Sequence, residues 1–283
     1  MSTFHCIAWP LAAASAMLAF PAMAQDNTFN RDKHFDGPYI SGTVGVAAQP
    51  NDPGDTLMFD TGSGSYNDTV TTAAGGNAFS PGFCNGRFTS TAPGTGCSND
   101  KDRVAYSGRI GYDKRMGSNI AIGALVEGSG NNALDGTSAF STTPAAYEIT
   151  RGLDYAISAR ARAGFTPGGG ALFYGTGGIS YAKIAHSFRT TNTANTFTPN
   201  RDGKMVFGYQ AGGGTEVMLT DHISLGLEYL FNRYKDNKYY VQVGQGTAAA
   251  TNPFILNGRT TRIRQGSENL TFHTLSATMS YRF

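Results

Sequence analysis

Nine charged residues stand at positions that the alternation of polar and apolar side chains assigns to one face of predicted strands. Buried charges are tolerated only when they are paired and hydrogen-bonded, and the signs of these nine nearly balance. We therefore expect a network of ion pairs inside the fold, although the same charges would also serve a narrow or gated ion path. The nine are Arg109, Asp113, Glu127, Asp154, Arg160, Arg162, Glu216, Glu228 and Arg282.

The remaining polar residues do not indicate catalysis. An enzyme would need a nucleophile beside a base, or clustered acid and base groups. The histidines are scattered, and His273 and Ser276 lie three residues apart, which places them on opposite faces of a strand. Glycine clusters such as 168–170 and 212–214 lack the helix that follows a nucleotide-binding loop. We predict no enzyme, no catalytic residue, no metal site and no cofactor.

Eight segments alternate strictly enough to be strands rather than helices. In residues 223–231, for example, Ile223 and Leu225 share one face, and Ser224 and Glu228 share the other. The eight predicted strands are 39–49, 103–113, 119–129, 149–165, 172–184, 206–219, 223–231 and 274–283.

The connections between these segments alternate between long and short. The stretches 50–102, 130–148, 186–204 and 233–268 are long, whereas those between them contain only a few residues. Outer-membrane barrels join short periplasmic turns to longer extracellular loops, and their strands face lipid and interior in turn. The chain is therefore predicted to be all-β, an up-and-down antiparallel transmembrane barrel of eight strands with long extracellular loops and periplasmic termini.

The beginning of the chain contains a short apolar run followed by a small-x-small triplet. This pattern is typical of a secretory signal peptide, whereas an anchoring helix would need about 20 apolar residues. The predicted domains are then a cleaved signal peptide, a short periplasmic lead and the barrel, at residues 1–24, 25–36 and 37–283.

Cys84 and Cys97 are the cysteines that remain after removal of such a signal. In an exported protein an even pair at short spacing indicates a disulfide. Two free thiols are the alternative. A metal site is poorly supported, because two cysteines cannot fill the usual four-ligand shell. We expect the disulfide to close a small loop within the long segment 50–102.

Aromatic residues are predicted to form two girdles, because Tyr and Trp are enriched at both membrane interfaces and outer-membrane barrels carry aromatic bands there. One girdle falls at the periplasmic ends of the strands and the other toward their opposite ends. The periplasmic set is Tyr39, Tyr112, Phe165, Phe173 and Phe283, and the opposite set is Tyr155, Tyr181, Phe207 and Phe231.

The last predicted strand ends in an aromatic residue. Apolar side chains occupy every second position from Leu275 to Phe283. Met279, Tyr281 and Phe283 resemble the C-terminal signal by which bacterial outer-membrane proteins are recognised for insertion, although Thr278 stands where a glycine is common. We therefore expect recognition by the outer-membrane barrel assembly machinery.

Together these features resemble the small OmpA-like, opacity-type outer-membrane β-barrels of Gram-negative bacteria. The resemblance rests on the order and spacing of short segments, and the first loop is unusually long for the family. The segments are SARARAGF (158–165), YGTGGISY (174–181), GGGTE (212–216), EY (228–229), HTL (273–275) and YRF (281–283).

The resemblance implies a place in the cell outer membrane, among its lipids including lipopolysaccharide. It also implies a structural or surface-interaction role, in envelope integrity or in adhesion of the loops to an extracellular ligand. A narrow or gated porin-like channel for ions or small solutes is the alternative. The net charge is only +2, so no basic stripe indicates a nucleic-acid partner.

Overall fold

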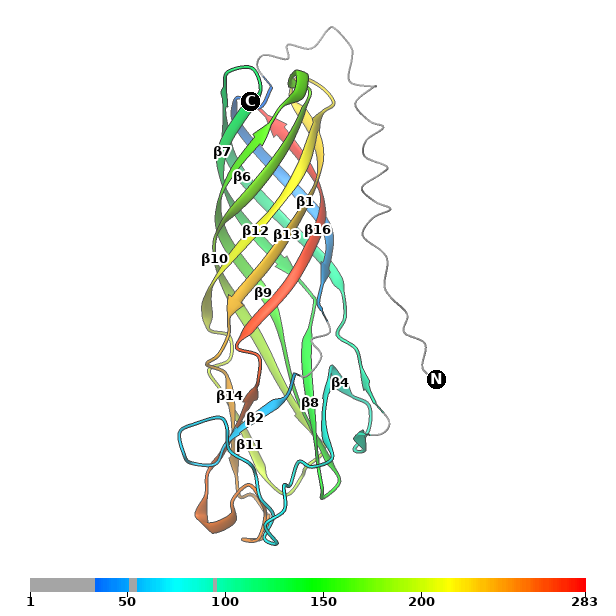
Figure 1. Cartoon of the computed structure of the whole chain (residues 1–283), viewed down its shortest axis with the longest axis vertical. Helices are drawn as coiled ribbons and strands as arrows, with labels where there is room; N and C mark the ends of the chain where they lie inside the picture. The colour runs from blue at the N-terminus through cyan, green and yellow to red at the C-terminus, as the bar shows by residue number, and fades with distance from the viewer. Residues whose placement is uncertain (1–33, 51–54, 94–95) are drawn as a thin grey trace.

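The computed structural model describes residues 34–50, 55–93 and 96–283, so the predicted signal peptide lies outside the described residues. Within these ranges no helix is long and apolar enough to cross a membrane. The dominant element is a closed antiparallel barrel, which Figure 1 shows along its length. Its eight strands are β1 (Gly37–Ala48), β6 (Arg103–Met116), β7 (Ile120–Asn131), β9 (Ala145–Phe165), β10 (Ala171–Thr190), β12 (Met205–Met218), β13 (Ile223–Lys235) and β16 (Asn269–Arg282).

Each barrel strand pairs with its neighbours in the chain, as expected for an up-and-down topology. Around the wall the order is β10-β12-β13-β16-β1-β6-β7-β9, and β9 pairs with β10 to complete the ring. The first and last strands close it, with Tyr39 opposite Arg282 and Ala48 opposite His273. The predicted eight-stranded barrel is confirmed, and each predicted strand coincides with an observed one.

The two faces of the wall differ as the alternation predicts. Ile110, Phe207 and Leu275 are 63%, 59% and 53% exposed on the outer face, which is the surface that meets lipid. The inner face carries mostly polar and charged side chains, and these are buried. An eight-stranded barrel has an interior just wide enough for side chains to fill it.

Two predicted side-chain positions are wrong. Tyr39 was expected in the lipid-facing girdle, but it points into the barrel and is only 1% exposed. Its neighbour Ile40 faces outward, so the side chains of β1 alternate as predicted. Only the placement of the Tyr39 ring at the membrane interface is wrong.

Asp154 was expected inside, but its side chain is 46% exposed and pairs with Lys183 at 2.9 Å on the outer surface. The physical reason is a β-bulge: Lys183 lies opposite Tyr155 and Ile184 opposite Leu153, which leaves Asp154 without a partner in the register. The extra residue reverses the facing of β9. Leu153 is therefore buried, while Tyr155 is exposed.

Beyond the barrel, at its lower end in Figure 1, the chain builds a second structure that we call the cap. A transmembrane strand needs about 9–11 residues, whereas β9 and β10 contain 21 and 20 and continue past the barrel. β8 (Asp135–Ser141) and then β3 (Gly82–Asn85) add to the edge of this extension.

The other loops contribute a separate four-stranded sheet to the cap. Its order is β11 (Thr196–Asn200), β14 (Tyr240–Gly244), β15 (Thr261–Gln265) and β2 (Leu57–Asp60), and a short pair is formed by β4 (Arg87–Phe88) and β5 (Cys97–Ser98). β14 and β15 are a hairpin within 233–268, but they join strands from two other loops rather than standing alone.

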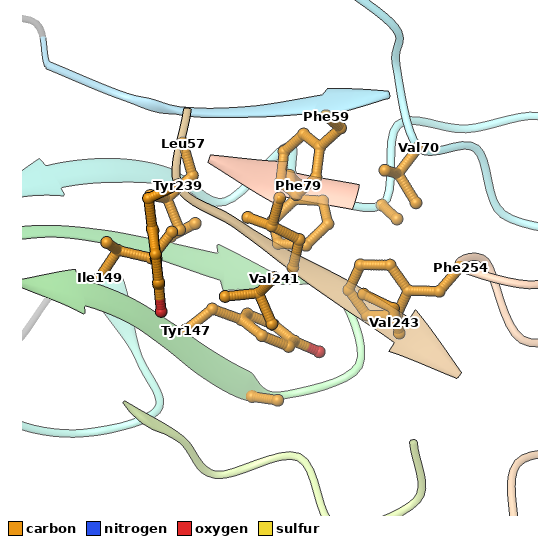
Figure 2. Packing of buried hydrophobic residues seen from close by; sticks show 14 residues of the cluster. Leu57, Phe59, Val70, Phe79, Tyr147, Ile149, Tyr239, Val241, Val243 and Phe254 are labelled. Atoms are coloured by element: carbon orange, nitrogen blue, oxygen red, sulfur yellow. The ribbon is translucent and has the colours of Figure 1, made fainter. Parts of the chain in front are cut away.

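The cap has its own apolar core, in which all four extracellular loops meet (Figure 2). The Phe79 ring lies 4.3 Å from that of Phe59 and 5.4 Å from that of Tyr147, and Tyr147 lies 5.5 Å from Phe254. Val241 and Ile263 of the sheet are completely buried against them. The loops are therefore one packed unit, not four independent solvated segments.

Candidate functional site

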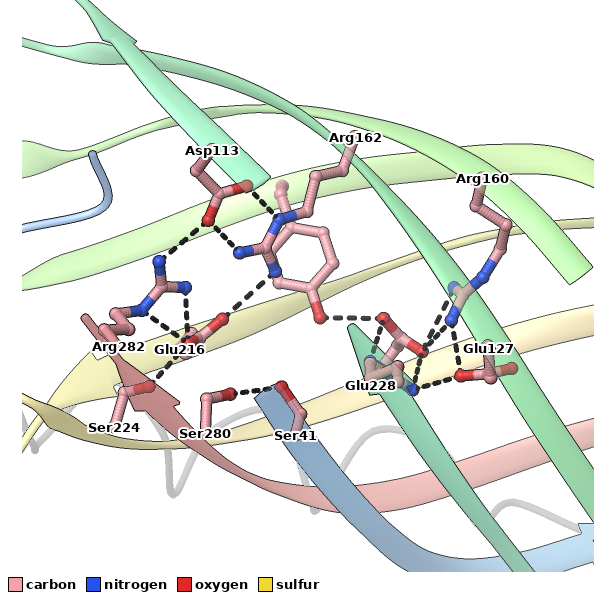
Figure 3. A network of polar contacts seen from close by, with 12 residues as sticks. Ser41, Asp113, Glu127, Arg160, Arg162, Glu216, Ser224, Glu228, Ser280 and Arg282 are labelled. Carbon is pink, nitrogen blue, oxygen red and sulfur yellow. Dashed lines mark hydrogen bonds and ion pairs between the residues drawn. The ribbon is translucent and has the colours of Figure 1, made fainter. Parts of the chain in front are cut away.

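The periplasmic half of the barrel interior holds a cluster of four paired charges (Figure 3). Arg282 lies 2.8 Å from Asp113 and 2.7 Å from Glu216. Arg162 contacts the same two carboxylates, with its Nη1 3.1 Å from Glu216 Oε2 and its guanidinium against Asp113. Ser224 donates a further hydrogen bond to Glu216. Two arginines and two carboxylates thus form a closed square.

A second square occupies the middle of the barrel. Arg109 lies 2.7 Å from Glu127 and 2.9 Å from Glu228. Arg160 lies 2.8 Å from Glu127 and 3.2 Å from Glu228. All four side chains are at most 4% exposed, so each charge is neutralised by its partners rather than by solvent.

Two tyrosines pack among these charges, and one of them, Tyr174, connects the two squares. Tyr174 donates a hydrogen bond of 2.8 Å to Glu228, while the Arg162 guanidinium lies 5.1 Å from the centre of its ring. Tyr39 lies under Arg162 and Arg282, at 4.5 Å and 4.8 Å. With Tyr39 from β1 and Tyr174 from β10, every strand of the barrel contributes a side chain to this network.

Inward-facing glycines make room for the two rings. A Cβ at Gly111 would overlap the Tyr39 ring, and a Cβ at Gly214 would overlap the Tyr174 hydroxyl. Glycine in a strand commonly marks such a close approach. Gly111 and Gly214 therefore serve packing of the barrel interior.

The periplasmic mouth is covered by the short segment that precedes β1. Phe35 is fully buried beneath the guanidinium of Arg282, whose Cζ lies 4.6 Å from the ring centre. His34 spans the mouth, with Nδ1 3.1 Å from the Gly169 carbonyl and Nε2 3.1 Å from Asp221. Part of the predicted periplasmic lead thus closes the barrel.

The extracellular mouth is closed by an apolar layer instead. Leu153, Ile184 and Leu270 are buried there, together with the stacked rings of Tyr234 and Phe272. Between this layer and the central square lies a polar cavity with about 30 Å³ of space for the centres of water-sized molecules. That volume is enough for a few water molecules but not for a solute path.

Eight of the nine charges expected inside belong to this network, and Asp154 does not. Sequence reasoning missed Tyr39, Tyr174 and Phe35. Tyr174 lies at an inward-facing position of β10, between the exposed Phe173 and Gly175. The alternation along this strand would have identified it.

A different polar cluster joins the cap to the barrel. His186 lies 2.9 Å from Asp236 and 3.3 Å from Asp202, and its ring stacks on Tyr239 at 4.1 Å. Burial alone would raise the pKa of Asp236, but the hydrogen bond from His186 and the charge of Arg151 outweigh it and hold this pKa below its ordinary value. Burial raises the pKa of Tyr239.

The predicted disulfide is present within the cap, where Cys84 of β3 bonds to Cys97 of β5. Both cysteines pack beside Phe88 and Phe140. Nearby, Glu148 is buried and receives Arg87 at 3.1 Å and Arg189 at 2.6 Å. The disulfide therefore ties β3 to β5 within the first loop, while the contacts of Arg87 and Arg189 hold that loop against β9 and β10.

Met279, Tyr281 and Phe283 share the outer face of the last strand and are 55%, 44% and 67% exposed. This position leaves them available to lipid. Their recognition by the barrel assembly machinery stays a prediction.

A closed barrel of eight strands, with an apolar outer belt and paired charges inside, defines a transmembrane outer-membrane protein. The chain belongs to the outer membrane protein beta-barrel domain family, whose model matches residues 11–283. The protein therefore resides in the outer membrane, with the cap on its extracellular side.

Two curated relatives are similar to this chain, both described as 31 kDa outer-membrane immunogenic proteins, from Brucella melitensis and Brucella suis. Each is 23% identical over 175 residues, which is 62% of this chain and 64% of the relative. The match thus spans less than two thirds of these relatives.

Among solved structures, the outer membrane protein OprG from Pseudomonas aeruginosa aligns with this chain. It is 11% identical, with a TM-score of 0.48 over 88% of this chain and 97% of OprG. The translocator domain of the autotransporter NalP from Neisseria meningitidis is also 11% identical, with a TM-score of 0.25 over 96% and 95% of the two chains.

Proposed function

We propose that this protein is a surface-interaction protein, in which a sealed barrel anchors the cap and presents it to the cell exterior. The single observation that carries the proposal is the common core of the four loops, in which Phe79, Tyr147 and Phe254 pack together. Loops that served only to join strands would not need a core of their own, because short connections suffice for that.

The barrel interior supports an anchoring role. Four arginines and four carboxylates compensate one another across it, and both mouths are covered by buried apolar groups. Transport would require these pairs to separate inside a low-dielectric interior, which is costly. The competing function is a narrow or gated channel, and the polar cavity beside Arg109 is the feature that favours it.

We infer binding rather than catalysis. His186 is the cap histidine that lies between two carboxylates, and each of its ring nitrogens is within 3.3 Å of one of them. A general base needs a free nitrogen directed at a substrate. The ring is instead held between Asp202, Asp236 and Tyr239, where it stabilises the connection between the cap and the barrel.

The loop tips offer a place for a ligand. A concavity of about 230 Å³ has an apolar floor, formed by Phe79, Tyr147 and Phe254, and a rim that includes the exposed Thr143 and Thr193. The Brucella relatives are described as immunogenic, and we infer that the loops of this chain are equally accessible to external proteins.

The test compares binding of cells that display the wild-type protein with binding of cells that display a capless variant, in which each long loop is replaced by a short glycine-serine turn. Adhesion to epithelial monolayers and to bare polystyrene is measured, and heat-modifiable gel mobility checks that the barrel has folded. We expect binding to be lost at equal surface levels. Unchanged binding of the capless cells would overturn the proposal.

A second variant leaves the cap core intact. T143R/T193R places two large cations on the rim of the concavity, and T89R/T198R places two on exposed residues of the cap that do not line it. Reduced adhesion of T143R/T193R, with normal adhesion of T89R/T198R, would locate the contact at the concavity.

A further inference from the structure

Four cationic residues lie at or near the extracellular ends of three neighbouring barrel strands. Lys183 lies on β10, Lys204 immediately precedes β12, and Arg233 and Lys235 lie on β13. These strands are adjacent in the order β10-β12-β13. The Lys183 side chain lies against Gly203, which brings it beside Lys204. We call this set the basic rim.

The basic rim lies at the level of the extracellular aromatic girdle. Arg233 is directly opposite Tyr209 in the register of β12 and β13, and Lys183 is two residues beyond Tyr181, which faces Phe207. The rings of Tyr181, Phe207 and Tyr209 are 50%, 59% and 45% exposed. Aromatic girdles mark the depth of the lipid headgroups. The cations therefore point toward the headgroups of the outer leaflet.

Most of these charges are not used within the protein. Lys183 pairs with Asp154, and the neighbouring Asp202 is already paired with His186. Lys204, Arg233 and Lys235 are exposed and form no ion pair with any carboxylate among the described residues. These three cations lie on or next to neighbouring strands with no carboxylate paired to them, so each would attract an external anion that approaches this side of the barrel.

We propose that the basic rim binds the phosphate groups of a phosphorylated glycolipid of the lipid A type in the outer leaflet. The acyl chains of such a lipid would lie on the exposed belt that includes Leu225, eight residues before Arg233 on β13, while its phosphates meet the cations at the extracellular end. Arg and Lys are the usual partners of phosphate, and cations near a membrane surface attract anionic headgroups. The extracellular position of the rim selects the outer leaflet over the periplasmic one.

The opposite side of the barrel provides a matched control. Lys101 and Arg103 are exposed cations at the extracellular end of β6, which stands four strands away from β12 in the ring of eight. A site on the basic rim requires Arg233 and Lys235 but not these two. A general attraction of positive charge to the lipid would depend on both pairs equally.

The experiment measures retention of bisphosphorylated lipid A by the purified full chain in detergent, using native mass spectrometry and a lipid titration. R233Q/K235Q is expected to weaken binding by at least about tenfold, while K101Q/R103Q leaves it unchanged. Dephosphorylated lipid A is expected to bind wild type as weakly as intact lipid A binds R233Q/K235Q. Heat-modifiable mobility checks folding.

Wild-type affinity of R233Q/K235Q, equal losses in both double variants, or equal binding of dephosphorylated lipid A would overturn the proposal. Stronger retention of phosphatidylglycerol than of lipid A would also overturn it, because the occupant would then be a phospholipid. R233K/K235R keeps both charges and is expected to bind. If R233Q/K235Q does not fold, K204Q, which changes a loop residue, supplies the comparison.

Discussion

Arg109 of β6 and Glu228 of β13 meet across the barrel interior, with Arg109 Nη2 2.9 Å from Glu228 Oε1. Two strands, β1 and β16, separate them in the wall. Arg160 of β9 reaches the same carboxylate from the other side, at 3.2 Å. Glu228 therefore braces three distant strands and stands where a pore would have to run.

Glu228→Gln should destabilise the barrel, because it removes the negative charge that Arg109 and Arg160 share. Breaking a buried ion pair on one side typically costs about 3–5 kcal/mol. Urea unfolding in lipid vesicles, followed by heat-modifiable gel mobility, measures the loss. Asp154→Asn is the control, since its pair with Lys183 is exposed on the surface and such pairs contribute about 0–1 kcal/mol. Equal effects of the two substitutions would contradict a bracing role for Glu228.

Tyr39→Phe and Tyr174→Phe remove the same atom from the same interior, with opposite expected results. The Tyr39 hydroxyl is buried without a hydrogen-bond partner among the described residues, so its removal should stabilise the barrel by about 1 kcal/mol. The Tyr174 hydroxyl bonds to Glu228 at 2.8 Å, so its removal should destabilise by about 1.5–3 kcal/mol. The same unfolding assay compares them, and a shared sign would show that the placement of these rings is wrong.

Cys84→Ser with Cys97→Ser should loosen the cap and leave the barrel intact. A disulfide across a sequence separation of 13 restricts the unfolded chain by about 3 kcal/mol. Limited proteolysis of the folded protein should therefore cut the first loop faster in the double variant, with unchanged urea unfolding of the barrel. Cleavage at the wild-type rate would show that the packing around Phe140 holds the loop without the bond.

Acid should weaken the joint between the cap and the barrel at Asp236. Because the pKa of this carboxyl is lowered in the folded protein, its contribution to stability is present above the ordinary Asp value of about 3.9 and is lost as the pH falls through the folded pKa. Near-ultraviolet circular dichroism of the cap tyrosines, recorded from neutral pH downward, follows the change. His186→Gln, which removes one partner of Asp236, should move the transition to higher pH. An unchanged transition would assign it to other carboxylates.

Alternation along the chain was sufficient to predict the eight strands and the inward side of Glu228 and Arg282, because that pattern is local. The bulge at Asp154 was not predictable from it, since Leu153 and Tyr155 are both compatible with lipid and conceal the change of face. Tyr39 was assigned by residue type to an interface, whereas the decisive factor is the space left by Gly111 on the next strand.

The structure of the cap could not be predicted from local alternation either, because its core is made by residues that are far apart in the sequence. Its core joins Phe59, Tyr147, Phe197 and Phe254, which come from four different loops. Each loop alone appears polar and rich in turn residues. The apolar side chains become a core only when the barrel brings the loop ends together, and that is information about tertiary structure.

Conductance of the purified full chain in planar bilayers tests most directly whether the network around Glu228 seals the barrel. The sealed barrel predicts no unitary current steps over a wide voltage range, both for the wild type and for the capless variant, because the interior pairs are the same in each. Discrete, reproducible steps in the wild type that change amplitude in Arg160→Ala would contradict this account and would assign the interior to a channel.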